Sequence, residues 1–321
     1  MRLAWVVHNP AAGRFSSDLL VQRAASVFSS RGWTVHLETA RQREHLKDII
    51  RRSLAASAEV LVVAGGDGTV GLAASLLRGS QTALGVIPTG TANVWARELG
   101  IPMVSRAHPK SVDRVAGRLA EGTLRQVDLG EANGRAFLLW AGTGLDARVV
   151  NLVEPRRRID KILPTTLYLI HTLRSASGWG GVELEVVWPG GRAAGRFMLA
   201  VASNVRSYGG GLLRLAPMAR VDDGLLDFWI LKGHSLGDTV WRLLQVMRGV
   251  HLTSDRFVHF QASQAEFRAA GSLPMHFDGE PGLLQAPIHL KVLPDELRIL
   301  LPSGNPGGLF RSAPPGSAED I

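Results

Sequence analysis

The first hundred residues alternate short apolar runs with amphipathic stretches, and this alternation constrains the fold more than any other feature. The apolar runs have the length of buried strands and lie at 3–8, 33–38, 59–64 and 82–88. The stretches that follow them have apolar residues at helical spacing and lie at 18–30, 43–56, 70–77 and 92–99. Strand–helix alternation predicts a parallel sheet covered on both faces. We therefore expect a doubly wound α/β domain over residues 1–124.

The rhythm changes from about Thr123, where short apolar runs are bounded by Gly, Pro, Asn or Asp and some alternate with period two. This pattern predicts a mostly antiparallel second domain, a β-sandwich, over residues 125–302. We leave open whether its last segment returns to the first domain. Helices are expected within it at 161–174 and 236–250. Residues 303–321 are rich in Gly, Pro and Ser, which predicts a disordered tail.

The net charge of +8 comes mostly from arginine, and the chain has no cysteine. Such a charge suits nucleic acid, a phosphate-rich small molecule or an anionic membrane face. The basic residues are scattered and lack interleaved aromatic residues, which argues against nucleic acid. The absence of cysteine excludes disulfides and thiolate metal sites. We find no signal peptide and no apolar stretch of the roughly 20 residues that a membrane span needs, so we expect a cytoplasmic protein.

Three glycine-bearing loops follow predicted strands: HNPAAGR at 8–14, GGDGT at 65–69 and PTGTAN at 88–93. Ligands of open parallel sheets bind beyond the carboxyl ends of the strands, and glycine lets backbone N–H groups approach a phosphate. Thr69, Thr89 and Thr91 can add hydroxyl donors. Asp67 suits a Mg²⁺ ion beside a nucleotide. The alternative is that 65–68 is only a tight turn with Asp67 as a helix cap.

The motifs NPAAGR, GGDGTV and PTGTANVWARELGIP occur in this order in the first domain. AGTGLDA at 141–147, SNVRSYGGGLLRLAPMARVDDGLLD at 203–227 and FDGEPG at 277–282 follow in the second domain. Together they resemble the diacylglycerol kinase catalytic-domain family of bacterial soluble lipid kinases, related to sphingosine kinases and more distantly to NAD kinases. The resemblance implies an NAD-kinase-like α/β domain followed by a β-sandwich, with ATP and lipid meeting between them.

The resemblance also implies the roles of individual residues. Asp67 would organise nucleotide and Mg²⁺, and Glu280 would accept the proton of the lipid hydroxyl. A structural Mg²⁺ would be held by the Asp223 carboxylate and the backbone carbonyls of Arg220 and Leu225. The ATP site would be lined by Asn9, Pro10, Ala11, Ala12, Gly13, Thr39, Gly65, Gly66, Asp67, Gly68, Thr69, Val70, Gly71, Leu72, Thr91 and Asn93.

Three residues depart from the family pattern. Gly71 and Leu72 stand where the family usually has Asn and Glu, and Val94 stands where many members have Asp. These changes remove polar groups near the expected metal, so a catalytically inactive lipid- or nucleotide-binding regulator stays an alternative. An NAD kinase is the other alternative, because the GGDGT motif is shared with the NAD kinase family. Asp278-Gly279 is also a strong hairpin dipeptide, so the DGE motif has a structural reading as well.

The expected activity is phosphorylation of a lipid alcohol by ATP, with diacylglycerol as the leading substrate and phosphatidic acid as the product. The run Arg156–Arg158 with Lys161 precedes an apolar stretch at 163–173, a pattern that suits peripheral docking on the anionic inner membrane face. A solvated charge run is the alternative. Asp146, within AGTGLDA, has either a role in the site or a structural one. The oligomeric state stays open, with a homodimer among the expectations.

Overall fold

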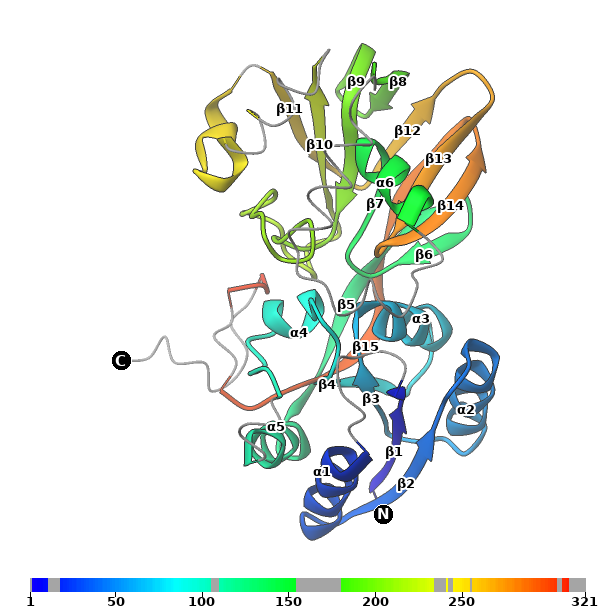
Figure 1. Ribbon diagram of the computed structural model, residues 1–321, viewed down its shortest axis with the longest axis vertical. Coiled ribbons are helices and arrows are strands. Elements are labelled where there is room, and N and C mark those ends of the chain that lie inside the picture. The colour runs from blue at the N-terminus through cyan, green and yellow to red at the C-terminus, as the bar shows by residue number, and fades with distance from the viewer. Residues whose placement is uncertain are drawn as a thin grey trace. The chain divides into compact units, whose positions relative to one another are not determined.

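The computed structural model describes residues 2–10, 18–104, 110–153, 180–233, 241, 245–254, 256–304 and 308–311 (Figure 1). The chain forms two compact units. Unit 1 comprises residues 1–128, 221–223 and 294–321, and unit 2 comprises residues 129–220 and 224–293. Two long strands, β5 (Thr123–Ala132) and β15 (Ile288–Leu301), contribute residues to both units.

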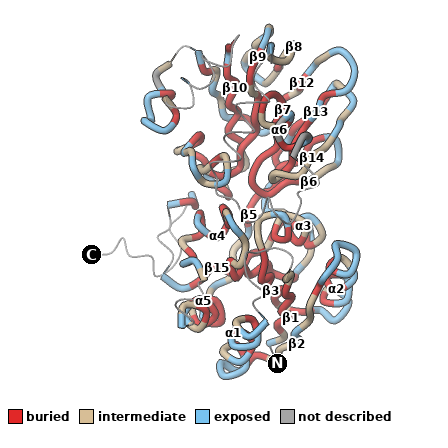
Figure 2. Tube along the Cα trace, in the orientation of Figure 1, coloured by how far each residue is buried: buried red, intermediate tan, exposed pale blue. Residues whose placement is uncertain are grey.

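Unit 1 is an α/β domain whose parallel sheet has the strand order β15-β4-β3-β1-β2. Its strands are β1 (Arg2–His8), β2 (Trp33–Thr39), β3 (Val60–Gly65), β4 (Ala83–Pro88) and the second half of β15. Every residue of β3 and β4 is buried, as expected for the centre of a sheet covered on both faces (Figure 2).

Five helices of unit 1 are described: α1 (Asp18–Ser30), α2 (Arg43–Ala55), α3 (Asp67–Leu77), α4 (Val94–Glu98) and α5 (Lys110–Ala120). The connection from β1 through α1 to β2 runs in one direction along the sheet, and the next two connections run in the other. Because such crossovers are right-handed, α1 lies on one face and α2 and α3 on the opposite face (Figure 1). Helix α5 packs against α1, and α2 packs against α3.

Unit 2 is a β-sandwich with antiparallel strand pairing. Its elements are β6 (Arg135–Phe137), β7 (Trp140–Gly144), α6 (Leu145–Val153), β8 (Val182–Trp188), β9 (Gly191–Ser203), β10 (Leu226–Lys232), the 3₁₀-helix η3 (Val250–Thr253), β11 (Phe257–Ala262), β12 (Gln264–Arg268), β13 (Ser272–Phe277) and β14 (Glu280–Gln285). Strand β9 pairs with β7, β8 and β10, and its apolar residues share one buried cluster with those of β10, β12, β13 and β15.

The structure confirms the predicted fold class, an α/β domain followed by a mostly antiparallel β-sandwich. Two of the described helices, α5 and α6, were not predicted from the sequence. The apolar positions of α5, at 112, 115, 116 and 119, do recur at helical spacing, whereas α6 begins inside an apolar run that reads equally well as a strand.

The expected tail needs a correction at Leu309 and Phe310, which are buried in unit 1. The Leu309 carbonyl accepts a hydrogen bond from Val221 N at 3.1 Å, and the Phe310 ring packs below the Arg125 guanidinium. Apolar packing and a backbone hydrogen bond therefore order this short segment. The rest of the tail beyond 311, the expected helix at 161–174, the basic run at 156–161 and most of the expected helix at 236–250 lie outside the described residues.

Candidate functional site

The carboxyl ends of β1, β3 and β4 lie side by side at one edge of the sheet of unit 1, because these strands are parallel neighbours. Backbone hydrogen bonds join the loops that follow them, from Asn9 N to Ala64 O at 3.1 Å and from Thr89 N to Gly65 O at 3.2 Å. The Asn9 side chain donates to Thr69 Oγ1 at 3.0 Å. The described beginnings of the three loops thus meet at one edge of the sheet, as the sequence predicted from their positions, while residues 11–14 of the first loop lie outside the described residues.

Two of these loops touch through bare backbone. A Cβ atom on Gly90 would lie 2.4 Å from Gly66 Cα and 2.8 Å from Asn93 Oδ1. Any side chain at Gly90 would therefore push the loop after β4 away from the loop after β3. Asn93 has a left-handed backbone with φ of 49°, and its side chain donates to Gly90 O at 2.8 Å and accepts from Gly90 N at 3.0 Å. Asn93 thereby fixes the turn that keeps Gly90 against Gly66.

Asp67 begins α3, but its carboxylate stabilises the start of a different helix. Trp95 N in α4 donates to Asp67 Oδ1 at 3.2 Å. Burial raises the pKa of Asp67 above its ordinary value of 3.8, and hydrogen bonds from the backbone N–H groups of Trp95, Val94 and Asn93 only partly offset this rise. Asp67 therefore caps a helix, as the alternative interpretation proposed, but that helix is α4. Helix α3 is preceded by Gly66 and has no side-chain cap among the described residues.

The edge also fits an anionic ligand. The Thr89 hydroxyl is buried and has no hydrogen-bond partner among the described residues. An unsatisfied buried hydroxyl is costly unless a ligand or water completes it. Asp67 contributes one carboxylate at the same edge, which fits the usual binding of Mg²⁺ through one or two carboxylates together with nucleotide phosphates.

The remaining residues predicted for ATP binding have varied surroundings. Thr39 ends β2 and is half-buried, and Gly68 and Thr91 are exposed. Val70 is buried in α3, and the departures Gly71 and Leu72 are half-buried in the same helix. Pro10 follows Asn9 and is half-buried, whereas Ala11, Ala12 and Gly13 lie outside the described residues.

The predicted structural metal ligands lie in the loop that precedes β10. Arg220 is exposed, and Asp223 and Leu225 are half-buried. In the described part of the chain, no three His, Asp or Glu side chains gather as a metal site would require. A site built from one carboxylate and two carbonyls is not of that kind, so this assignment stays a prediction.

In unit 2, the Asp278-Gly279 dipeptide forms the turn between β13 and β14, with Phe277 paired to Glu280. Both turn residues have positive φ, 52° and 83°, as a two-residue hairpin of this kind requires. The Asp278 carboxylate accepts hydrogen bonds from the N–H groups of Leu138, Leu139 and Trp140, at 2.9, 2.8 and 3.1 Å. The turn is therefore anchored to the segment before β7, and Glu280 begins β14 at a fixed position.

The Glu280 side chain is 30% exposed and faces Arg135, with 3.6 Å between Arg135 Nη2 and Glu280 Oε2. The Arg135 guanidinium lies 4.1 Å from the centroid of the Phe277 ring and donates to Pro281 O at 3.2 Å. The carboxylate is accessible to a substrate and is oriented by a cation that is itself held in place.

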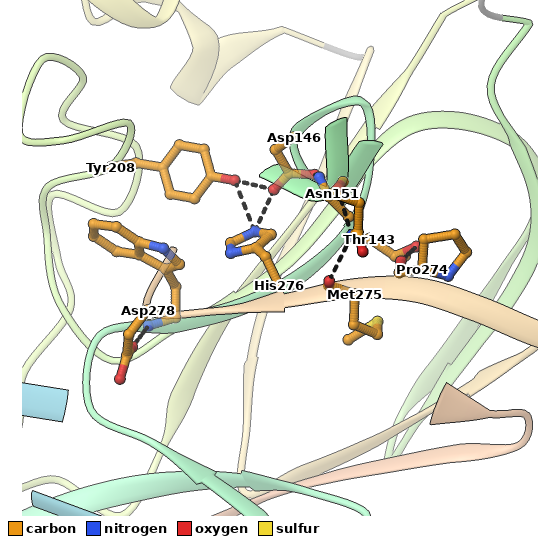
Figure 3. Close-up of polar contacts among 10 residues, drawn as sticks. Thr143, Asp146, Asn151, Tyr208, Pro274, Met275, His276 and Asp278 are labelled. Carbon is orange, nitrogen blue, oxygen red and sulfur yellow. Dashed lines mark hydrogen bonds and ion pairs between the residues drawn. The ribbon is translucent and has the colours of Figure 1, made fainter. Parts of the chain in front are cut away.

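A second polar cluster in unit 2 was not recognised as such in the sequence (Figure 3). Asp146, in the first turn of α6, binds the Tyr208 hydroxyl and His276 Nε2 through the same carboxylate oxygen, Oδ2. His276 and Tyr208 are buried. A Cβ atom on Gly142 would lie 2.8 Å from His276 Nε2, so glycine at this position admits the imidazole. The sequence signal was Asp146 within the AGTGLDA motif, for which the sequence left a role in the site and a structural role open.

Comparison with known proteins agrees with this architecture. Residues 3–132 match the diacylglycerol kinase catalytic domain, and residues 140–301 match the YegS C-terminal NAD kinase beta sandwich-like domain. The Pseudomonas aeruginosa protein named "Probable lipid kinase YegS-like" is 33% identical over 311 residues, 96% of each chain. The Bacillus subtilis protein named diacylglycerol kinase is 25% identical, over 88% of this chain and 91% of its own.

The fold recurs in a crystal structure of a diacylglycerol kinase from Bacillus anthracis, with a TM-score of 0.68 at 17% identity, over 94% of this chain and 96% of that one. Both sequence matches follow the two-part architecture of the chain, and together they span most of it. The chain belongs to the family of diacylglycerol kinase-like lipid kinases, in which an α/β catalytic domain precedes a β-sandwich domain.

Proposed function

We propose that the protein phosphorylates a lipid hydroxyl with ATP, and that diacylglycerol is its substrate and phosphatidic acid its product. The observation that carries this proposal is the edge of unit 1, where Gly66 and Gly90 meet backbone to backbone beside the half-buried carboxylate of Asp67. Bare backbone and helix starts suit phosphate groups. Membership of a lipid kinase family and the relative named diacylglycerol kinase point to the acceptor.

In this reaction, the lipid hydroxyl oxygen attacks the γ-phosphorus of ATP, and the bond from that phosphorus to the β–γ bridging oxygen breaks. The proton of the hydroxyl passes to the Glu280 carboxylate, and ADP leaves. Arg135 orients this carboxylate from 3.6 Å. Asp67 would hold a divalent cation that neutralises charge on the phosphate oxygens.

The test is transfer of the γ-phosphate of radiolabelled ATP to a panel of lipid alcohols in mixed micelles, with NAD as a further acceptor. We expect labelled phosphatidic acid from diacylglycerol and none from NAD. Glu280→Gln keeps the size of the side chain but removes the base, so we expect turnover to fall by at least 100-fold with an unchanged circular dichroism spectrum. Labelling of another lipid alcohol would correct the substrate. Nucleotide binding without any transfer would favour the inactive regulator.

We further propose that the protein reaches its lipid on an anionic membrane surface, through Trp241 and the segment 245–252 of unit 2. Trp241, Met247 and Leu252 expose 51%, 66% and 53% of their surface, and Arg248 is exposed between them in the sequence. Exposed apolar side chains beside a basic one suit the headgroup region of anionic lipids. Within the described part of the chain, no helix has the length and apolarity to cross a bilayer.

Cosedimentation with vesicles that contain phosphatidylglycerol tests this surface. Met247→Ser should weaken binding about fivefold, because roughly 1 kcal/mol of apolar transfer is lost. Met218→Ser is the matched control, since Met218 is equally exposed, at 66%, but lies outside the segment. Equal binding by both variants and the unsubstituted protein would refute the proposed surface.

A further inference from the structure

The Asp146–Tyr208–His276 network in unit 2 has a defined pattern of donors. Asp146 Oδ2 receives both the Tyr208 hydroxyl and His276 Nε2, which lies 2.5 Å away. Asp146 Oδ1 accepts from Ala147 N at 2.7 Å. Because the carboxylate can only accept, His276 Nε2 must carry a proton and the Tyr208 hydroxyl must donate. The network therefore depends on each of its three members.

Besides the antiparallel backbone pairing of β13 with β7, side-chain contacts join β13 to the β7–α6 segment at three places, and the network is one of them. Thr143 Oγ1 donates to Pro274 O at 2.7 Å, Asn151 Nδ2 donates to Met275 O at 3.2 Å, and Asp146 binds the His276 side chain (Figure 3). Three successive residues of β13 are thus held by the same segment. This strand leads directly into the Asp278-Gly279 turn and Glu280.

Tyr208 connects the network to another segment. It begins a tight turn over residues 208–213, closed by hydrogen bonds from Tyr208 N to Leu213 O at 2.7 Å and from Leu213 N to Tyr208 O at 3.1 Å. Gly209, Gly210 and Gly211 all have positive φ, so the turn depends on glycine. It presents Leu212, which is 58% exposed. Within unit 2, a hydroxyl and an imidazole therefore join this glycine turn to the hairpin that carries Glu280.

We propose that Asp146, Tyr208 and His276 are positioning residues that hold Glu280 in its reactive place and couple it to the glycine turn at 208–213. They act through the backbone of β13, because His276 faces the network while its neighbour Phe277 faces the Arg135 that orients Glu280. This role rests on the proposed function. It accounts for a buried hydroxyl and imidazole and a half-buried carboxylate at a place where apolar side chains would otherwise pack.

Two variants test the proposal, Tyr208→Phe, which removes only the hydroxyl, and His276→Gln, which removes the ring. We expect each to lower kcat for lipid phosphorylation by about 10- to 100-fold, with KM for ATP within twofold of the original value, because the ATP site lies in unit 1. We also expect hydrogen–deuterium exchange to quicken at least threefold in peptides covering 204–216 and 272–285. The exchange measurement needs no catalytic activity.

His259→Gln is the matched control, because His259 Nε2 forms another His–Asp pair in unit 2, with Asp227 Oδ1 at 2.9 Å. This control should change neither kcat nor exchange in the two peptides. The proposal is overturned if Tyr208→Phe and His276→Gln keep the original kcat, even if exchange quickens, since the network would then be merely structural. If the unsubstituted protein phosphorylates no lipid, the proposed function fails, and unchanged exchange in both variants would independently overturn the coupling.

Discussion

Removal of the Asp278 carboxylate should open the hairpin that carries Glu280. This carboxylate accepts three backbone N–H groups, from Leu138, Leu139 and Trp140, and all three residues are buried. A hydrogen bond to a charged group contributes about 1.5–3 kcal/mol. Three such hydrogen bonds at the lower limit contribute about 4.5 kcal/mol. Because water can reach the half-buried turn, the net loss of local stability on removing the carboxylate is roughly 3–4 kcal/mol.

Three substitutions at this position separate the contributions. Asp278→Gly loses the carboxylate but tolerates the φ of 52°, so it should cost about 3–4 kcal/mol. Asp278→Ala should cost about 1 kcal/mol more, because a Cβ atom disfavours the left-handed region. Asp278→Asn retains one acceptor oxygen and tolerates positive φ, so about 2 kcal/mol is expected. A domain is stable by about 5–15 kcal/mol, so unit 2 should stay folded in each variant.

Native-state hydrogen exchange of the β13 amides measures this local opening free energy, whereas global denaturation would mix the two units. The expected loss of opening free energy is largest for Asp278→Ala, smaller for Asp278→Gly and smallest for Asp278→Asn. If Asp278→Gly opens with a free energy within 1 kcal/mol of the original value, the carboxylate does not anchor the hairpin and the reasoning is wrong.

Further predictions concern unit 1. Because burial raises the pKa of Asp67 in the folded state, the folded protein binds this proton more tightly than the unfolded chain, so the contribution of Asp67 to stability should be fully present below pH 3.8 and be lost as pH rises through the raised pKa. The difference in urea stability between the original protein and Asp67→Asn should therefore change with pH over this range, and a difference that is constant with pH would contradict it. Gly90→Ala should weaken ATP binding at least tenfold in calorimetry, because its Cβ atom would lie 2.4 Å from Gly66 Cα, and wild-type affinity would show that the two loops need not touch. Thr89→Val should leave stability without nucleotide unchanged or higher, because it removes a buried unpaired hydroxyl, yet lower ATP affinity; a marked loss of stability would mean that this hydroxyl already has a partner.

Local features of the sequence determined a large part of the architecture. The alternation of apolar runs and amphipathic stretches predicted β1 to β4 and the helices α1 to α4, and Asp278-Gly279 predicted the hairpin turn. These predictions succeeded because residue spacing and turn chemistry act over a few neighbouring residues. The common edge at which these loops begin also followed, since parallel strands end on the same side of a sheet.

The tertiary structure alone decided which groups the key side chains contact. Asp67 accepts a hydrogen bond from the Trp95 amide of α4, 28 positions away, and Asp146 meets His276 across 130 positions of sequence. Such contacts arise when distant segments pack. The spacing of apolar residues along the sequence carries no information about which distant residue a polar side chain will contact. Sequence therefore sufficed for the elements and for the loops that suit phosphate, whereas packing between distant segments set the surroundings of Asp67 and Glu280 and built the Asp146–Tyr208–His276 network.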